Sequence, residues 1–219
     1  MRAVYLNGQI LGASGFPGGN QGLHCEWALI TESNWQKVQG LDKASAQSCP
    51  RAPLRDNPRR FVIIRAVRDR RGGLAQGQTQ LDFPADAQEA VWAHPIDVHY
   101  SVEQRVQGWP RFQLQVFQED RHGRNELVGY GFVHVPSAPG VHEVQCSCWR
   151  PVSPEWNDEV QAFFVGGNPQ LKSDDLISKH NDRYKLRTRS SGTVSFKLNV
   201  MLKGFSKYGF QFTKPETSA

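Results

Sequence analysis

Long hydrophobic runs are missing from this chain. Its 219 residues contain no stretch of about eighteen apolar residues, so no membrane-spanning helix is predicted. Residues 1–8 lack both the apolar stretch and the small-residue cleavage site of a secretory signal. The sequence therefore predicts a cytoplasmic protein that contacts membranes peripherally, if at all.

Cysteine is also scarce. Cys25, Cys49, Cys146 and Cys148 occur at irregular spacing, and without a secretory signal reduced thiols are favoured over disulfides. The paired Cys-x2-Cys spacing of structural zinc sites is absent. His142 would share one face of a strand with Cys146 and Cys148, which leaves a metal site open as an alternative. Buried thiols fit better, and no metal site is predicted.

Motifs for catalysis are absent as well. The glycine-rich loop 15–22 leads into a strand, whereas a phosphate cradle needs a helix N-terminus. No serine lies in a Gly-x-Ser-x-Gly elbow, and the adjacent Asp174 and Asp175 have the surroundings of solvated charges. Pro95 forces an extended backbone at His94, so His94 is expected at the start of a strand and not in a catalytic site. The sequence predicts no catalytic residue, no cofactor and no small-molecule substrate.

Alternating hydrophobic residues are the strongest pattern present. Phe112, Leu114 and Val116 face one side of a predicted strand at 111–118, and polar residues alternate with them. Similar segments lie at 4–11, 23–29, 78–83, 96–100, 127–135, 141–149 and 194–200. About eight short strands at this spacing predict an all-β fold, an antiparallel β-sandwich of two sheets. One short helix is expected after Ser153, which can cap it.

A basic segment at 41–75 interrupts this pattern. Residues 41–73 hold nine basic side chains against three acidic ones, so the remainder carries a charge of −1 out of the total of +5. The segment predicts a disordered insertion in a single domain at 1–212, followed by a tail at 213–219. It could simply be solvated, or it could contact anionic lipid through Arg59, Arg60, Arg68, Arg70 and Arg71. Nucleic acid is disfavoured because Phe61 is the one aromatic residue among these arginines.

The most distinctive stretch is 107–140. Trp109 precedes a predicted strand, and a proline-flanked loop follows the next one; it consists of Pro136, Ser137, Ala138 and Pro139. A stiff, exposed loop suits recognition of a partner, although a plain turn fits equally well. Trp109 is compatible with a partner site and with the core.

Together with motifs elsewhere, this stretch resembles the B9-domain family. The matching segments include 8–16, 77–80, 94–97, 149–151, 164–171 and 193–209. The likeness covers roughly 1–40 and 76–210. It implies a C2-like β-sandwich at the basal body and transition zone of cilia, in a complex with two paralogous B9-domain proteins and the tectonic proteins. There the protein would be a non-enzymatic scaffold, needed for cilium assembly and for gating the composition of the ciliary membrane.

C2 domains often bind calcium, which requires several carboxylates converging from loops. Gln118 and His24 occupy positions where such loops carry aspartate, so calcium binding is not predicted. The alternative function is a peripheral membrane-binding module that uses the basic segment on anionic lipid. Vesicle sedimentation with and without residues 41–75 distinguishes the two functions.

Overall fold

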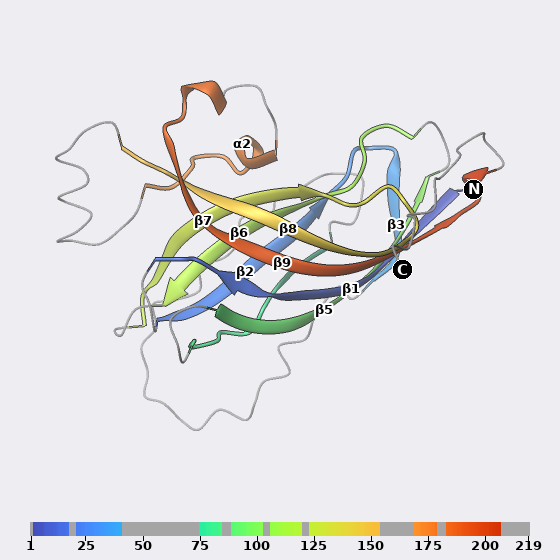
Figure 1. The fold of residues 1–219 in the computed structure, drawn as a ribbon. Helices are drawn as coiled ribbons and strands as arrows, with labels where there is room; N and C mark the ends of the chain where they lie inside the picture. Colours follow the sequence, from blue (N-terminus) through green and yellow to red (C-terminus); the bar gives the residue numbers. More distant parts are fainter. Residues whose placement is uncertain are drawn as a thin grey trace, which may run out of the picture.

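The computed structural model of the protein describes residues 2–17, 21–40, 75–84, 89–102, 106–119, 123–153, 169–178 and 183–206. Most of these residues belong to nine β-strands (Figure 1). The strands are β1 (Arg2–Ser14), β2 (Gly22–Ile30), β3 (Trp35–Gly40), β4 (Ala75–Gln78), β5 (Glu89–Val102), β6 (Arg111–Glu119), β7 (Asn125–His134), β8 (Gly140–Pro151) and β9 (Thr188–Lys203). Two short helical turns, α2 (Asp175–Ser178) and a 3-10 turn at Arg183–Lys185, precede β9. Neither described helix is long or apolar enough to cross a bilayer.

All nine strands form one antiparallel sheet in the order β3-β5-β1-β9-β8-β7-β6-β2-β4. The sheet folds back on itself between β8 and β7, which pair only at Tyr130 and Trp149. One half is β3-β5-β1-β9-β8 and the other is β7-β6-β2-β4. The predicted all-β fold is confirmed, with nine strands instead of about eight and with both layers belonging to one sheet.

Several boundaries differ from those expected. The strand predicted at 96–100 is the middle of β5, so His94 lies within a strand and not at its start. The strand predicted at 78–83 is shorter and earlier, and Asp82 forms only an isolated bridge to Leu23. Ala75, assigned to the insertion, is the buried first residue of β4. Residues 41–74, the helix expected after Ser153 and the tail at 213–219 lie outside the described residues.

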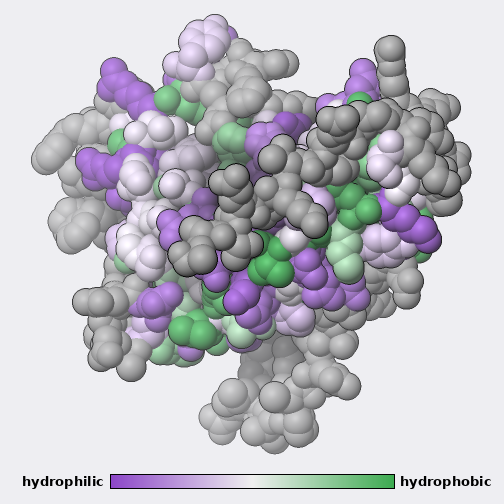
Figure 2. All heavy atoms as spheres, turned by 45° about the vertical axis from the view of Figure 1, so that its right-hand side comes forward, coloured by the Kyte–Doolittle hydropathy of each residue, from purple (hydrophilic) through white to green (hydrophobic). Residues whose placement is uncertain are grey.

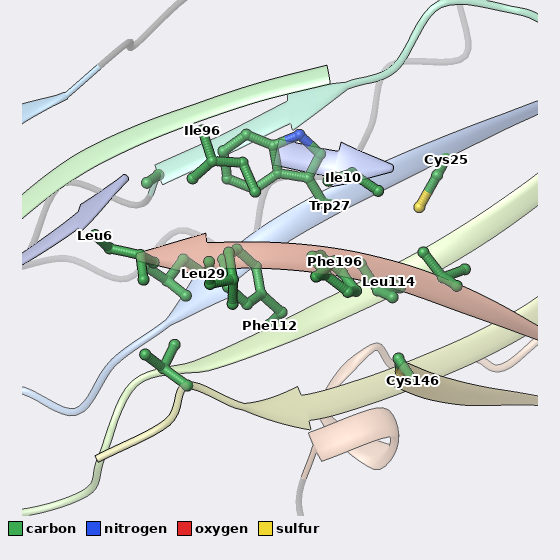
Figure 3. Close-up of a cluster of buried hydrophobic side chains, with 14 of the residues drawn as sticks. Leu6, Ile10, Cys25, Trp27, Leu29, Ile96, Phe112, Leu114, Cys146 and Phe196 are labelled. Carbon is green, nitrogen blue, oxygen red and sulfur yellow. The ribbon is translucent and has the colours of Figure 1, made fainter. Parts of the chain in front are cut away.

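The core lies between the two halves, because alternate residues of each strand point inward (Figure 3). Phe112 of β6 and Phe196 of β9 meet across it with ring centroids 5.3 Å apart. β5 shows this alternation most regularly: Trp92, His94 and Ile96 are buried, and the residues between them are exposed. The period of two in the sequence thus sets which side chains enter the core and which reach the surface.

One aromatic ring fills the space where the two halves meet. Phe16, just after β1, packs against Gly129 of β7 and Gly192 of β9. A Cβ on Gly192 would lie 2.6 Å from the Phe16 ring, and one on Gly129 would lie 3.0 Å from it. The Ser191 hydroxyl donates a hydrogen bond to the Val128 carbonyl beside them. A side chain at Gly192 would therefore collide with the ring, and one at Gly129 would require the ring to shift by a few tenths of an ångström.

We predict that Phe16→Ala lowers the free energy of unfolding by about 3 kcal/mol or more, because it removes a buried aromatic ring and leaves a cavity. Urea unfolding at neutral pH measures the change. Tyr184→Ala removes a ring that is 79% exposed and should stay within about 0.5 kcal/mol of the wild type. Equal stability of the two variants would show that Phe16 does not hold the halves together.

Candidate functional site

Trp109 and the loop after β7 lie together at one end of the sandwich. The Trp109 indole N–H donates to the Val135 carbonyl at 2.8 Å, and the Val135 N–H donates to the Pro110 carbonyl at 3.0 Å. The structure thus brings together Trp109 and the proline-flanked loop, which the sequence suggested as separate candidate sites. Because Val135 directly precedes the loop at 136–139, these hydrogen bonds fix where the loop begins.

The Trp109 ring itself is half-buried and packs at the edge of the core. It meets the Trp35 ring edge-on at 5.6 Å and the buried Phe205 ring at 6.2 Å. The Trp35 indole N–H in turn donates to the Gln107 carbonyl at 3.0 Å. The ring therefore positions the loop, and direct contact between Trp109 and a partner stays a prediction. Trp35 and Phe205 were not singled out from the sequence, since no local pattern shows that they meet Trp109.

Within the loop, Ser137 is exposed, while Pro136, Ala138 and Pro139 are half-buried. The His142 imidazole lies 2.9 Å from the Ala138 carbonyl and donates to it through Nε2. Two prolines restrict the backbone, and this hydrogen bond ties the loop to β8. Ser137 is therefore presented to solvent from a held backbone, as a recognition loop requires.

The expected degenerate calcium positions lie at the opposite end. His24 is buried and stacks on the Phe117 ring at 5.4 Å, and burial lowers the pKa of its imidazole. Gln118 is buried too. Within the described ranges, no three His, Cys, Asp or Glu side chains are arranged to hold a metal ion. Asp120, the carboxylate two residues after Gln118, lies outside those ranges.

Three described cysteines lie inside the core. Cys25 of β2 and Cys146 and Cys148 of β8 are buried and unoxidised, whereas Cys49 is not described. Figure 3 labels Cys25 and Cys146 on their strands. Burial raises the pKa of the Cys25 thiol. The hydrogen bond with Cys146 and then burial raise the pKa of the Cys148 thiol. Because only thiolates act as nucleophiles, the raised pKa values of Cys25 and Cys148 disfavour reactivity, and these buried side chains serve packing.

Two half-buried carboxylates, Glu26 and Asp174, lie on the outer face of the other half. Burial and, secondly, the nearby Asp174 carboxylate raise the pKa of Glu26 in β2. The segment that carries Asp174 also packs Ile177 and Leu171 over Leu127 and Tyr130 of β7. The basic side chains proposed for lipid contact, Arg59, Arg60, Arg68, Arg70 and Arg71, lie outside the described residues.

Comparison with known proteins assigns this architecture. The family described as "Ciliary basal body-associated, B9 protein" matches residues 4–201, from β1 to β9. The chain therefore belongs to the B9 family, as its motifs indicated. Over 211 residues it is 39% identical to B9 domain-containing protein 2 of Danio rerio and 36% identical to that of Homo sapiens, covering 96% of this chain and 99% of each relative. Mouse B9 domain-containing protein 1 is 32% identical over 140 residues, or 63% of this chain and 68% of that protein.

Glu26 generates a prediction about pH. A raised carboxyl pKa means that the folded protein holds this proton more tightly than the unfolded chain does. The stability linked to Glu26 is thus complete below its ordinary pKa of 4.5 and is lost as the pH rises through the folded pKa. Glu26→Gln should therefore gain stability relative to the wild type between pH 4 and pH 7, measured by urea unfolding. Glu143→Gln, at an exposed position, is the control; an equal gain there would contradict the prediction.

Proposed function

We propose that this protein is a non-enzymatic scaffold subunit at the ciliary transition zone. It would bind its two paralogous B9-domain proteins and components of the tectonic complex, and it would help to control the composition of the ciliary membrane. The match of the B9 family to the whole sandwich, residues 4–201, carries this proposal. A similarity that spans every strand supports the family role as a whole, while the binding site itself is argued from particular residues.

The chemistry of the described residues supports a binding role. The three described cysteines are buried, with raised pKa values at the Cys25 and Cys148 thiols, and His24 and His94 are buried with lowered pKa values caused by desolvation. Catalytic bases and nucleophiles lie within reach of a substrate, with pKa values near the working pH. By contrast, the exposed Ser137 loop is held from both sides in a manner suited to recognition.

Reconstitution tests the proposal directly. The purified protein is mixed with both paralogues, and size-exclusion chromatography with light scattering reports the mass of the complex. We expect a stable ternary complex. Separate elution of the three proteins at micromolar concentration would refute the scaffold role.

The loop yields a more specific prediction. Ser137→Arg should weaken binding to a paralogue by at least tenfold, because a long charged side chain would enter a desolvated contact. Its thermal unfolding should match that of the wild type, since Ser137 is exposed. Isothermal titration calorimetry measures the affinity.

Ser190→Arg is the matched control for this variant. Ser190 is also exposed but pairs with Trp149, far along β8 from the loop. Ser190→Arg should bind the paralogue with the affinity of the wild type. Unchanged affinity of Ser137→Arg would show that the loop is a plain turn.

A further inference from the structure

A second, smaller hydrophobic cluster lies outside the main core. Leu127 and Tyr130 of β7 are buried together with Ile177 of α2, on the outer side of the β7-β6-β2-β4 half (Figure 1). This cluster shares no member with the one that fills the space between the two halves. The segment at 169–178, which we call the strap, therefore packs on a sandwich whose own core is already closed.

Side chains attach the strap to the sheet. Ile177 is fully buried in the cluster, and Leu171 packs at its edge. The Leu171 N–H donates a hydrogen bond to the Tyr130 hydroxyl at 3.1 Å, whereas the Ile177 N–H donates to the Asp174 carbonyl at 3.0 Å, within the strap itself. Within the described ranges, the strap pairs with no strand. It can therefore leave the sheet without breaking a strand ladder.

The strap lies on the line where β7 and β8 part. Tyr130 and Trp149 are the residue pair that joins these strands, and the centroids of their rings lie 5.5 Å apart. Trp149 packs against the same outer cluster as Ile177. Phe16 fills the inner side of this line, next to Gly129. The strap thus closes from outside the joint that Phe16 fills from inside.

Charge weakens the contact between the strap and the sheet. Glu26 of β2 and Asp174 of the strap are both half-buried. Burial, and after it the charge of Asp174, raises the pKa of Glu26. The ladder partners of Glu26 are the uncharged Gln78 and Gln115, so neither of them offsets the pair. Two ionised carboxylates on facing elements repel each other, which favours separation of the strap at neutral pH.

The surface view is consistent with apolar side chains held just below a polar exterior. In Figure 2, hydrophobic residues (green) lie between hydrophilic ones (purple) on the face that it shows. Segments with few buried apolar contacts open at a lower free energy than the core of the same protein. The strap has this character, because Ile177 is its one fully buried apolar side chain among the described residues.

We propose that the strap is a detachable cover, which opens as a unit while the sandwich stays folded and is released more readily because Glu26 and Asp174 repel each other. Opening uncovers the rings of Tyr130 and Trp149 at the joint between β7 and β8. The closed strap withholds this aromatic surface. The proposal does not depend on the scaffold role proposed above.

Hydrogen exchange with mass spectrometry on the full chain at pH 7 tests the proposal. A peptide covering 169–178 reports opening of the strap through the bonded Leu171 and Ile177 amides, and a peptide covering 194–200 in β9 reports unfolding of the sandwich. In the wild type the strap should exchange at least tenfold faster than β9. Equal protection of the two peptides would overturn the proposal.

A core variant distinguishes local opening from global unfolding. Leu6→Ala weakens the buried core of the other half, so β9 should exchange faster by the factor that urea unfolding measures, while the strap keeps the wild-type rate within twofold. Acceleration of both peptides by the same factor would show that the strap opens only with the sandwich. If Leu6→Ala does not fold, low urea on the wild type replaces it: exchange of β9 should rise with urea and that of the strap should stay nearly constant.

Two further variants test what holds the strap and what releases it. Ile177→Ala should speed exchange of the strap at least tenfold, and Tyr184→Ala, at a residue 79% exposed, should leave it unchanged. Glu26→Gln removes the repulsion and should slow exchange of the strap at least threefold, whereas Glu143→Gln, at an exposed position, should not. A wild-type rate in Ile177→Ala would show that Ile177 is not the anchor, and a wild-type rate in Glu26→Gln would refute the role of charge.

Discussion

Packing of side chains at the fold line, and not a strand ladder, holds the two halves of this sheet together. β7 and β8 share a single residue pair, Tyr130 and Trp149, so the backbone alone cannot fix the angle between the halves. The Phe16 ring supplies that constraint by occupying the space that Gly129 and Gly192 leave open. Because interiors are packed to near-crystalline density, a ring in this position sets the distance between the inner faces of the two halves. That distance in turn sets how the side chains of the whole core pack.

Closure of the core then determines what the outer surfaces can do. Each strand has one inward and one outward set of side chains. Closing the core buries the inward set, so the outward set alone forms the surface. Ile177 and Leu171 cover apolar residues of β7, so that face is occupied by the chain itself. Among the described residues, none covers Val141 and Met201 in this way, and both are exposed. The Trp109 cluster adds a fixed loop next to Val141, so rigidity and exposed apolar surface occur side by side along β8.

The sequence predicted the fold class well because period-two alternation reports directly which face of a strand is buried. Val194, Phe196, Leu198 and Val200 were expected as one strand, and all four are fully buried in β9. Alternation does not report which distant segments touch. The contacts of Trp109 with Trp35 and Val135 could therefore not be predicted. The extent of β5 was underestimated because Pro95 argues locally against a continuous strand, whereas pairing with β1 carries the strand through it.

The place of the basic segment follows from the same strand order. β3 and β4 are the two edge strands of the sheet, and the 34 residues between Gly40 and Ala75 connect them. Edge strands pair on one side only, so a connection between them crosses no ladder. Each doubling of loop length costs only about 0.6 kcal/mol of closure entropy. A long, highly charged stretch therefore costs the fold least at this connection, whereas the same 34 residues between β1 and β2, beside Phe16, would disturb the packing on which the two halves depend.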